Sequence, residues 1–495
     1  MTIGVLLDLR LTLEGLTEAP AMLKEILADT RAFDGCGGVD VLIDQQDPTP
    51  LICPVNHVTR PAESEIAHLQ TFCSGSFPRV GRMISTATAV RIPEAPFRGA
   101  DPAASDGTRS STRLTALDGL RGVAAMVVVL HHLYLVAEPV LRRQGGTGMG
   151  SALWWLSQTP LKLLTAGSEA VLVFFVLSGI VVALPTLKHG GFSWAGFLSG
   201  RLARLYLPVW ASLVIGTAVI WMVPRSDSVI TSGTWMDTAQ ATSVGWGSLF
   251  TEASLTTGSY AVNNVLWSLR WELVFSVLLP LFVALAILVS RFWVIAIAAV
   301  CVISTLGVLN GVDALRYLPV FFIGTLMAVR LDAIRQWTRR SLLRPRVSLA
   351  GGALVAGSLL LLVGEWMMRP VFASGSFMNI LLSQLSVLGA AGLVLAAIAV
   401  RPVRSALDAR PTQWLGRVSF SLYLVHMPIL ATLTFILGDD RWWLVAILTL
   451  PLALLAAWGF NRIVERPSHR LARAITGAVT ARLDTHRGHR VPPGA

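Results

Sequence analysis

The chain has 495 residues, of which 54% are apolar and only 14% are charged. An average soluble domain carries about 25% charged residues, so this deficit excludes a disordered chain and an ordinary cytosolic enzyme and predicts a protein that lies mostly in lipid. Residues 1–100 hold 8 basic and 12 acidic residues (8 − 12 = −4), whereas the remainder holds 32 and 17 (32 − 17 = +15), so two regions with different surroundings are expected.

The four cysteines, Cys36, Cys53, Cys73 and Cys301, include no CxxC pair, and no histidine stands at metal-ligand spacing. We therefore expect neither a disulfide framework nor a metal site. The first ten residues include Asp8 and lack a cationic start followed by an apolar run, so no signal peptide is predicted.

Residues 1–75 are predicted to form a small α+β domain. Alternation predicts a strand over Val5–Leu11, helical spacing predicts a helix over Thr17–Ala32, and a second strand is expected over Val39–Ile43. The stretch "LADTRAFDGCGGVDVLIDQQDPTPL" resembles the antibiotic biosynthesis monooxygenase family, which implies a ferredoxin-like fold. The family's strand with Glu and Trp reads "ICPVNHV" here, so we expect an inactive remnant, a fused module or a misplaced start codon. Residues 76–113, rich in Pro, Ser, Gly, Ala and Arg, are predicted to be a linker.

From about residue 115 the chain turns apolar, and most of the apolar segments reach the roughly 20 residues that a membrane helix needs. The ten segments are 115–136, 161–184, 205–223, 264–289, 292–310, 315–331, 348–364, 378–400, 416–437 and 441–464. Residues 114–467 are therefore predicted to be an all-α integral membrane protein with about ten transmembrane helices, followed by a basic cytoplasmic tail, 468–495.

The basic residues predict the orientation of these helices. If the N-terminus is cytoplasmic, the inner connections and the tail hold 21 Lys and Arg residues and the outer connections hold 7. The positive-inside rule then predicts a multi-pass protein of the inner cell membrane with both termini in the cytoplasm.

Arg121 and His132 are candidate site residues because ionisable groups inside membrane spans are costly and are retained mainly for function. They are 11 residues apart, so they share one helix face about 16 Å apart, while His131 points about 100° away. Asp118 lies one turn before Arg121. The alternative is a buried histidine bonded to a backbone carbonyl and an arginine that reaches the lipid phosphates.

Three further ionisable residues lie later in the chain, one inside a segment and two between segments. Glu272 is expected near mid-membrane, where it must be protonated or paired, and a clasp between helices is the structural alternative. Arg201 and Arg204 follow the second segment and share a helix face. They suit a phosphate clamp or a headgroup anchor, and the residues before them predict a short amphipathic helix at the inner leaflet.

Two other motifs are interpreted mainly as packing. In the ninth segment Tyr423 and His426 lie three residues apart on one helix face. In the second segment Ser178 and Gly179 permit a close approach of a neighbouring helix.

Five motifs stand in one order along the chain: "LDGLRGVAAMVVVLHH", "VFFVLSG", "RLARLYLP", "LWSLRWELVFS" and "SFSLYLVHMPI". Together they resemble the acyltransferase 3 family of integral membrane acyltransferases, over residues of about 113–470. One departure is Val173, where many members carry an acidic or polar residue. The resemblance implies transfer of an acyl group, often acetyl, from a coenzyme A thioester to a hydroxyl, commonly of a sugar.

The resemblance also implies roles for residues at matching positions. His132 would be the general base, Arg121 would hold the pantetheine or pyrophosphate end, and Arg201 with Arg204 would bind the donor phosphates. Further roles follow: Asp118 orients Arg121, Glu272 binds acceptor hydroxyls or steadies the imidazolium, Trp267 stacks on a sugar, and Ser268, Tyr423 and His426 bind substrate.

The expected partners are acyl-CoA as donor substrate, a carbohydrate or glycosylated small molecule as acceptor, and the lipid bilayer. No bound cofactor and no nucleic-acid partner are expected. A proton-coupled transporter or an acyl-group translocator is the main alternative, because histidine and glutamate inside membrane spans also suit transport. A structural or receptor-like membrane protein is a third possibility.

Overall fold

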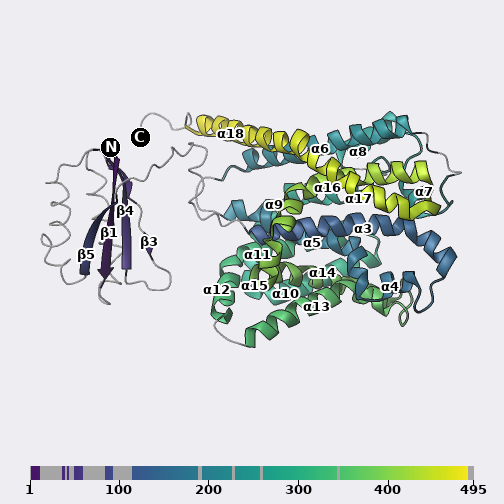
Figure 1. Cartoon of the computed structure of the whole chain (residues 1–495), viewed down its shortest axis with the longest axis horizontal. Helices are drawn as coiled ribbons and strands as arrows, with labels where there is room; N and C mark the ends of the chain where they lie inside the picture. The colour runs from purple at the N-terminus through teal and green to yellow at the C-terminus, as the bar shows by residue number, and fades with distance from the viewer. Residues whose placement is uncertain are drawn as a thin grey trace. The chain divides into compact units, whose positions relative to one another are not determined.

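The computed structural model describes residues 114–187, 192–223, 225, 229–256, 260–342 and 346–488, together with five strands between residues 2 and 92. The chain divides into two compact units, Met1–Thr112 and Arg113–Ala495. Each unit is described by itself (Figure 1).

The first unit contains an antiparallel sheet. Its strands are β1 (Thr2–Leu11), β2 (Cys36–Val39), β3 (Leu42–Ile43), β4 (Pro50–Thr59) and β5 (Ile84–Ile92), in the order β2-β4-β1-β5, with β3 paired to β4. The strand predicted over Val5–Leu11 lies inside β1, whereas the one predicted over Val39–Ile43 is divided between β2 and β3. The predicted helix Thr17–Ala32 lies outside the described residues, so a ferredoxin-like fold is not supported.

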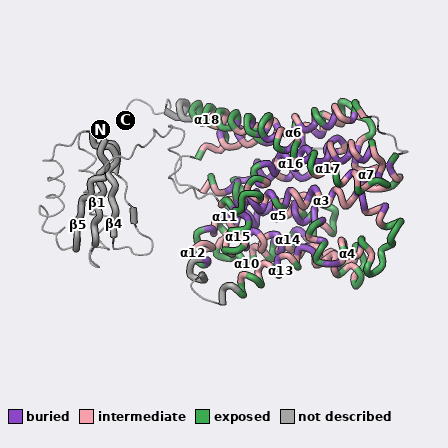
Figure 2. Tube along the Cα trace, in the orientation of Figure 1, coloured by how far each residue is buried: buried purple, intermediate pink, exposed green. Residues whose placement is uncertain are grey.

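The second unit is a bundle of helices. The long ones are α3 (Thr115–Gly145), α5 (Gly167–Ala183), α6 (Trp194–Met222), α9 (Leu266–Val289), α10 (Trp293–Leu309), α11 (Asp313–Val329), α13 (Arg346–Met368), α14 (Phe377–Ala399), α16 (Arg410–Leu437), α17 (Trp442–Phe460) and α18 (Arg466–Gly488). The shorter ones are α4 (Ala152–Gln158), η3 (Pro160–Thr165), η4 (Leu184–Leu187), α7 (Trp235–Ala239), α8 (Trp246–Ser254), η5 (Ser290–Phe292), α12 (Leu331–Leu342), α15 (Arg401–Leu407), η6 (Asp439–Arg441) and η7 (Asn461–Glu465). Buried residues concentrate along α3, α5 and α16, and exposed ones along α18 (Figure 2).

By length and composition, the described residues contain eight helices that could cross a membrane, or nine if the bent pair α11 and α12 is one span. One of the eight, Leu266–Leu309, covers two predicted segments. Its halves α9 and α10 run in opposite directions, as their contacts with α11 show. The contacts of α9 advance along α11 in the same chain direction, whereas the end of α10 contacts the start of α11. Phe275 of α9 stacks on Phe321 and Ser290 accepts a hydrogen bond from Arg330, whereas Ser304 of α10 bonds the carbonyl of Arg316. All ten predicted segments are thus mainly helical, and the count of ten spans stays a prediction.

Three predicted boundaries need correction. The segment 161–184 starts with the 3₁₀-helix η3, and its α-helix begins only at Gly167. The expected amphipathic helix near 192–202 is not separate, because α6 runs without a break from Trp194 to Met222. The segment 468–495, predicted as a basic tail, contains most of α18, which packs along the first half of α6.

The close approach expected at Gly179 is present between α5 and α11. A Cβ atom on Gly179 would lie 2.2 Å from the carbonyl oxygen of Phe321, and one on Gly324 would lie 2.1 Å from that of Val176. Two glycines therefore face each other, and the helix backbones touch, as in small-residue packing of membrane helices. This contact sets the distance between the two helices beside the cavity described below.

We expect Gly179→Val to destabilise the protein by about 1–3 kcal/mol, because the added atoms must push α5 away from α11. The matched control is Gly357→Val inside α13, where no atom lies within 4 Å of an added Cβ. Thermal unfolding of the detergent-purified variants checks this. Equal melting temperatures for the two variants would contradict the close contact.

Candidate active site

A cavity of about 140 Å³ lies between α3, α5, α6, α9, α16 and the π-helix η7. Its charged lining consists of Arg121, Arg201, Arg204, Glu272 and Glu465, and its hydroxyl lining of Ser178, Ser268, Ser419 and Tyr423. Six of the ten predicted site residues line it, while Asp118, His132, Trp267 and His426 do not. The walls are otherwise apolar, so this is a charged pocket inside a hydrophobic bundle.

Arg201 and Glu272 form an ion pair in this cavity. Arg201 Nη2 donates to Glu272 Oε1 over 2.8 Å, and Arg201 Nε donates to Ser276 Oγ over 2.6 Å. Ser178 Oγ also donates to Glu272 Oε1 over 3.3 Å. Glu272 therefore clasps α9 to α6, the structural alternative named above. Its described polar contacts do not include His132, so its predicted role beside the imidazolium gains no support.

Arg121 and Arg204 are differently placed. Both line the cavity, and within the described residues neither takes part in a hydrogen bond or an ion pair. The cavity holds three guanidinium groups and two carboxylates (3 − 2 = +1), and the Arg201–Glu272 pair is neutral as a whole. Arg121, Arg204 and Glu465 remain, so the net charge of +1 comes from two guanidinium groups that Glu465 offsets in part. Unpaired guanidinium groups at a cavity suit phosphate or another anion.

Glu465 is a cavity residue that the sequence analysis missed. It is the last residue of the π-helix η7, where the helix register shifts. Its carboxylate accepts hydrogen bonds from Ser421 Oγ and from Asn461 Nδ2, the latter over 2.9 Å. The predicted segment 441–464 ended one residue too early, so this acidic group next to an apolar run escaped attention.

Two of the hydroxyl groups that line the cavity, those of Tyr423 and Ser268, are hydrogen-bonded to each other. Tyr423 OH and Ser268 Oγ are 2.6 Å apart, and Tyr423 OH also donates to the carbonyl of Val265 over 3.2 Å. Both side chains are buried. His426 follows Tyr423 by one turn of α16, and the centroids of their rings are 6.1 Å apart.

His132 and His426 meet behind this pair of hydroxyls. His426 Nε2 lies 3.1 Å from His132 Nδ1, and the rings come from α16 and α3. Trp235 of α7 covers His132, with ring centroids 5.2 Å apart and planes tilted by 33°. The ring of His132 is therefore held between another span and the connection that joins α6 to α9.

The hydrogen bonds assign a tautomer to each imidazole. His426 Nδ1 bonds the carbonyl of Leu422 over 2.9 Å, so its proton is on Nδ1 and its Nε2 is an acceptor. His132 Nδ1 lies 2.9 Å from the carbonyl of Val128 and faces the acceptor nitrogen of His426, so it too carries the proton. The Nε2 atom of His132 then holds a lone pair, and no described residue hydrogen-bonds it. A neutral histidine oriented in this way can act as a general base.

Comparison with known proteins gives one match of a family model, an acyltransferase domain over residues 114–462. The chain belongs to this acyltransferase family. It is also 27% identical over 386 residues to the acyltransferase MdmB of Streptomyces mycarofaciens, covering 72% of this chain and 92% of that protein. No solved structure matches the chain. The protein is thus a membrane acyltransferase, and every residue that lines the cavity except Glu465 lies inside the matched domain.

Three other residues of the acyltransferase domain lie apart from the cavity. His131 Nδ1 bonds the carbonyl of Thr165 over 2.8 Å, and its ring meets that of His132 edge to face, with centroids 5.4 Å apart. Asp118 lies in the first turn of α3, where its carbonyl is against Gly416. Trp267 packs against Tyr317 with ring centroids 5.2 Å apart and does not line the cavity, so a sugar-stacking role for it gains no support.

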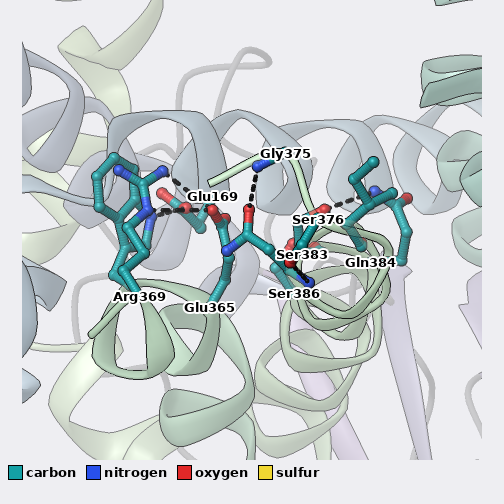
Figure 3. Close-up of polar contacts among 11 residues, drawn as sticks. Glu169, Glu365, Arg369, Gly375, Ser376, Ser383, Gln384 and Ser386 are labelled. Atoms are coloured by element: carbon teal, nitrogen blue, oxygen red, sulfur yellow. Dashed lines mark hydrogen bonds and ion pairs between the residues drawn. The ribbon is translucent and has the colours of Figure 1, made fainter. Parts of the chain in front are cut away.

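A second polar cluster of the acyltransferase was not predicted. Lys162 is fully buried and stands 3.7 Å from the ring of Trp366, whose Nε1 donates to Glu169 Oε1 over 2.8 Å. Arg369 pairs with Glu365 over 2.9 Å beside them (Figure 3). These residues join η3 and α5 to α13. Because the groups satisfy one another and line no described cavity, we interpret the cluster as structural.

Proposed function

We propose that this acyltransferase moves an acyl group, acetyl in the simplest case, from acyl-CoA to a hydroxyl of a carbohydrate or a glycosylated metabolite, with His132 as general base. The observation that carries the proposal is the arrangement of α3. This one helix presents Arg121 to the charged cavity and, about 16 Å further along, His132 to His426.

The donor would lie along this line. Its phosphates would meet Arg121 and Arg204, which have no described partner, and its pantetheine arm would extend through the cavity. The thioester would reach the Tyr423 and Ser268 hydroxyls, whose O–H groups would turn from the carbonyl of Val265 to bind the thioester carbonyl oxygen. Tyr423 would turn aside for the arm to pass, because it lines the cavity and its ring lies against that of His426, with centroids 6.1 Å apart.

The chemical step needs only one base. His132 Nε2 accepts the proton of the acceptor hydroxyl, whose oxygen attacks the thioester carbonyl carbon. The carbon–sulfur bond breaks, and the thiolate of coenzyme A leaves and takes up the proton. His426 orients the ring of His132 through its Nε2 atom. No serine or cysteine among the described residues hydrogen-bonds a histidine, which favours direct transfer.

The acceptor would approach from the side of α7. Trp235 lies over His132 and is only half-buried, and it belongs to the connection between α6 and α9. By the predicted orientation this connection is extracytoplasmic, and the arginines are at the cytoplasmic end. This placement favours a translocating variant of the reaction, in which the acyl group crosses the bilayer to an acceptor outside.

The detergent-purified protein is expected to release free thiol from acetyl-CoA only when a hydroxylated acceptor is added. A thiol-reactive dye follows the reaction, and mass spectrometry shows the acetylated acceptor. Candidate acceptors come from envelope glycans and secreted glycosylated metabolites of the source strain. A protein that transports these compounds in vesicles without consuming acetyl-CoA would favour the transporter alternative instead.

A further inference from the structure

The helices α6 and α18 pack against each other beyond the charged cavity. A Cβ atom on Gly200 would meet Thr476 Oγ1 at 2.0 Å, and one on Gly196 would meet Thr480 Oγ1 at 2.3 Å. The two helices are thus antiparallel and in close contact, and they lie side by side in Figure 1. Their shared surface begins at the cavity, where Arg204 and Glu465 lie.

Glu465, the last residue of η7, is followed at intervals of four residues by His469 and Arg473 of α18, so the three share one helix face. His469 Nε2 lies 3.8 Å from Glu465 Oε1, beyond hydrogen-bond distance, and this buried atom has no hydrogen-bond partner among the described residues. The charged neighbours that act on His469 are Arg204, Arg473 and Arg121.

The charged residues around His469 carry an excess of positive charge. Arg121, Arg204 and Arg473 contribute three charges and Glu465 removes one (3 − 1 = +2), while Arg201 is already paired with Glu272. The excess runs from inside the cavity, at Arg121, to the exposed Arg473 on α18. A ligand with several phosphates at one end and an uncharged arm at the other would match this distribution.

We propose that His469 and Arg473 of α18, together with Arg204, form a subsite for the phosphates at the nucleotide end of the donor. This inference rests on the proposed function. His469 Nε2 offers a hydrogen-bonding atom that lacks a described partner, and Arg473 offers a guanidinium for a phosphate monoester. The nucleotide lies on the α6–α18 surface, while the pantetheine arm enters the cavity past Arg204.

Binding of adenosine 3′,5′-bisphosphate to the full-length, detergent-purified protein tests the subsite without any turnover. Isothermal titration is expected to show tighter binding of this probe than of adenosine 5′-monophosphate, because the second phosphate adds a charged contact. Arg473→Ala should weaken binding of the bisphosphate about tenfold, the usual effect of losing one charge-assisted hydrogen bond. His469→Asn should weaken it as well and leave binding of the monophosphate less affected.

Arg470→Ala is the matched control, since Arg470 is an exposed arginine of the same helix and is not a charged neighbour of His469. It should bind the bisphosphate as the unmodified protein does. Unchanged binding in Arg473→Ala, or an equal loss in both variants, would overturn the subsite. Thiol release from acetyl-CoA is scored separately. Bisphosphate binding that depends on Arg473, without acyl transfer, would defeat the proposed function alone.

Discussion

Replacing His132 with Ala is expected to lower kcat of acyl transfer about a thousandfold, since general-base catalysis contributes about 10²–10⁴ to a rate. The hydrogen bonds to Val128 and His426 use the Nδ1 atom of His132. The lone pair on its Nε2 atom is therefore available to accept a proton. Without it the acceptor hydroxyl must lose its proton to solvent or to His426. Steady-state rates with acetyl-CoA and a fixed acceptor measure the effect.

The matched control for this loss is His131→Gln. His131 is the neighbouring residue and has the same kind of side chain. Its Nδ1 atom bonds Thr165 and its ring packs on Gly167, although the edge of one ring also meets the other, with ring centroids of His131 and His132 5.4 Å apart. We expect the control to keep most of the activity, and both variants to reach the membrane in normal amounts. Full activity of His132→Ala would remove His132 from the base role, even if the acyltransferase assignment stands.

The periodicity of the sequence was sufficient to predict the helices and the residues that share a face. Hydropathy placed ten segments, and each is mainly helical in the structure. The spacing of 11 residues put Arg121 and His132 on one side of α3, and the structure places one at the cavity and the other at His426. These are local properties of a helix, so the sequence alone can reveal them.

The partners of these residues could not be predicted, because they come from distant parts of the chain. His426 is 294 positions from His132, and Glu272 is 71 positions from Arg201. Trp235 belongs to a connection that has no hydropathy signal. The position of Glu465 depends on a π-helix, which changes the register by one residue and has no simple sequence pattern. The positions of these four residues depend on how the helices pack and on local helix distortion, and the periodicity of the sequence carries no information on either.

The structure gives different surroundings to Arg201 and Arg204, which the sequence analysis interpreted as one phosphate-binding pair. Arg201 and Arg204 both line the cavity, but only Arg201 has described partners, in Glu272, Ser276 and Ser178. A guanidinium that already holds a carboxylate and a hydroxyl has little left for a phosphate. Under the proposed function, the donor phosphates would therefore depend on Arg204 and Arg121, and Arg201 would be a positioning residue.

Arg201→Gln is expected to destabilise the protein by about 3–5 kcal/mol, because it leaves the carboxylate of Glu272 inside the bundle without its cation. Glu272→Gln should cost a similar amount by leaving Arg201 alone. The double variant Arg201→Gln/Glu272→Gln should recover much of this loss, since two neutral amides can bond each other and no charge is left unpaired. Thermal unfolding of the three purified variants gives the coupling between the two residues.

Arg204→Gln provides the comparison from the same helix, one turn further along. Its guanidinium has no described partner, so the melting temperature should stay near that of the unmodified protein, while KM for acetyl-CoA should rise about tenfold. KM for the acceptor should not change. If the losses of stability in Arg201→Gln and Glu272→Gln simply add in the double variant, the two residues are not coupled. Arg201 would then again be a candidate ligand of the donor phosphates. If Arg204→Gln leaves KM for the donor unchanged, the cavity does not bind the donor through this residue, and the positive charge of the site must serve another anion.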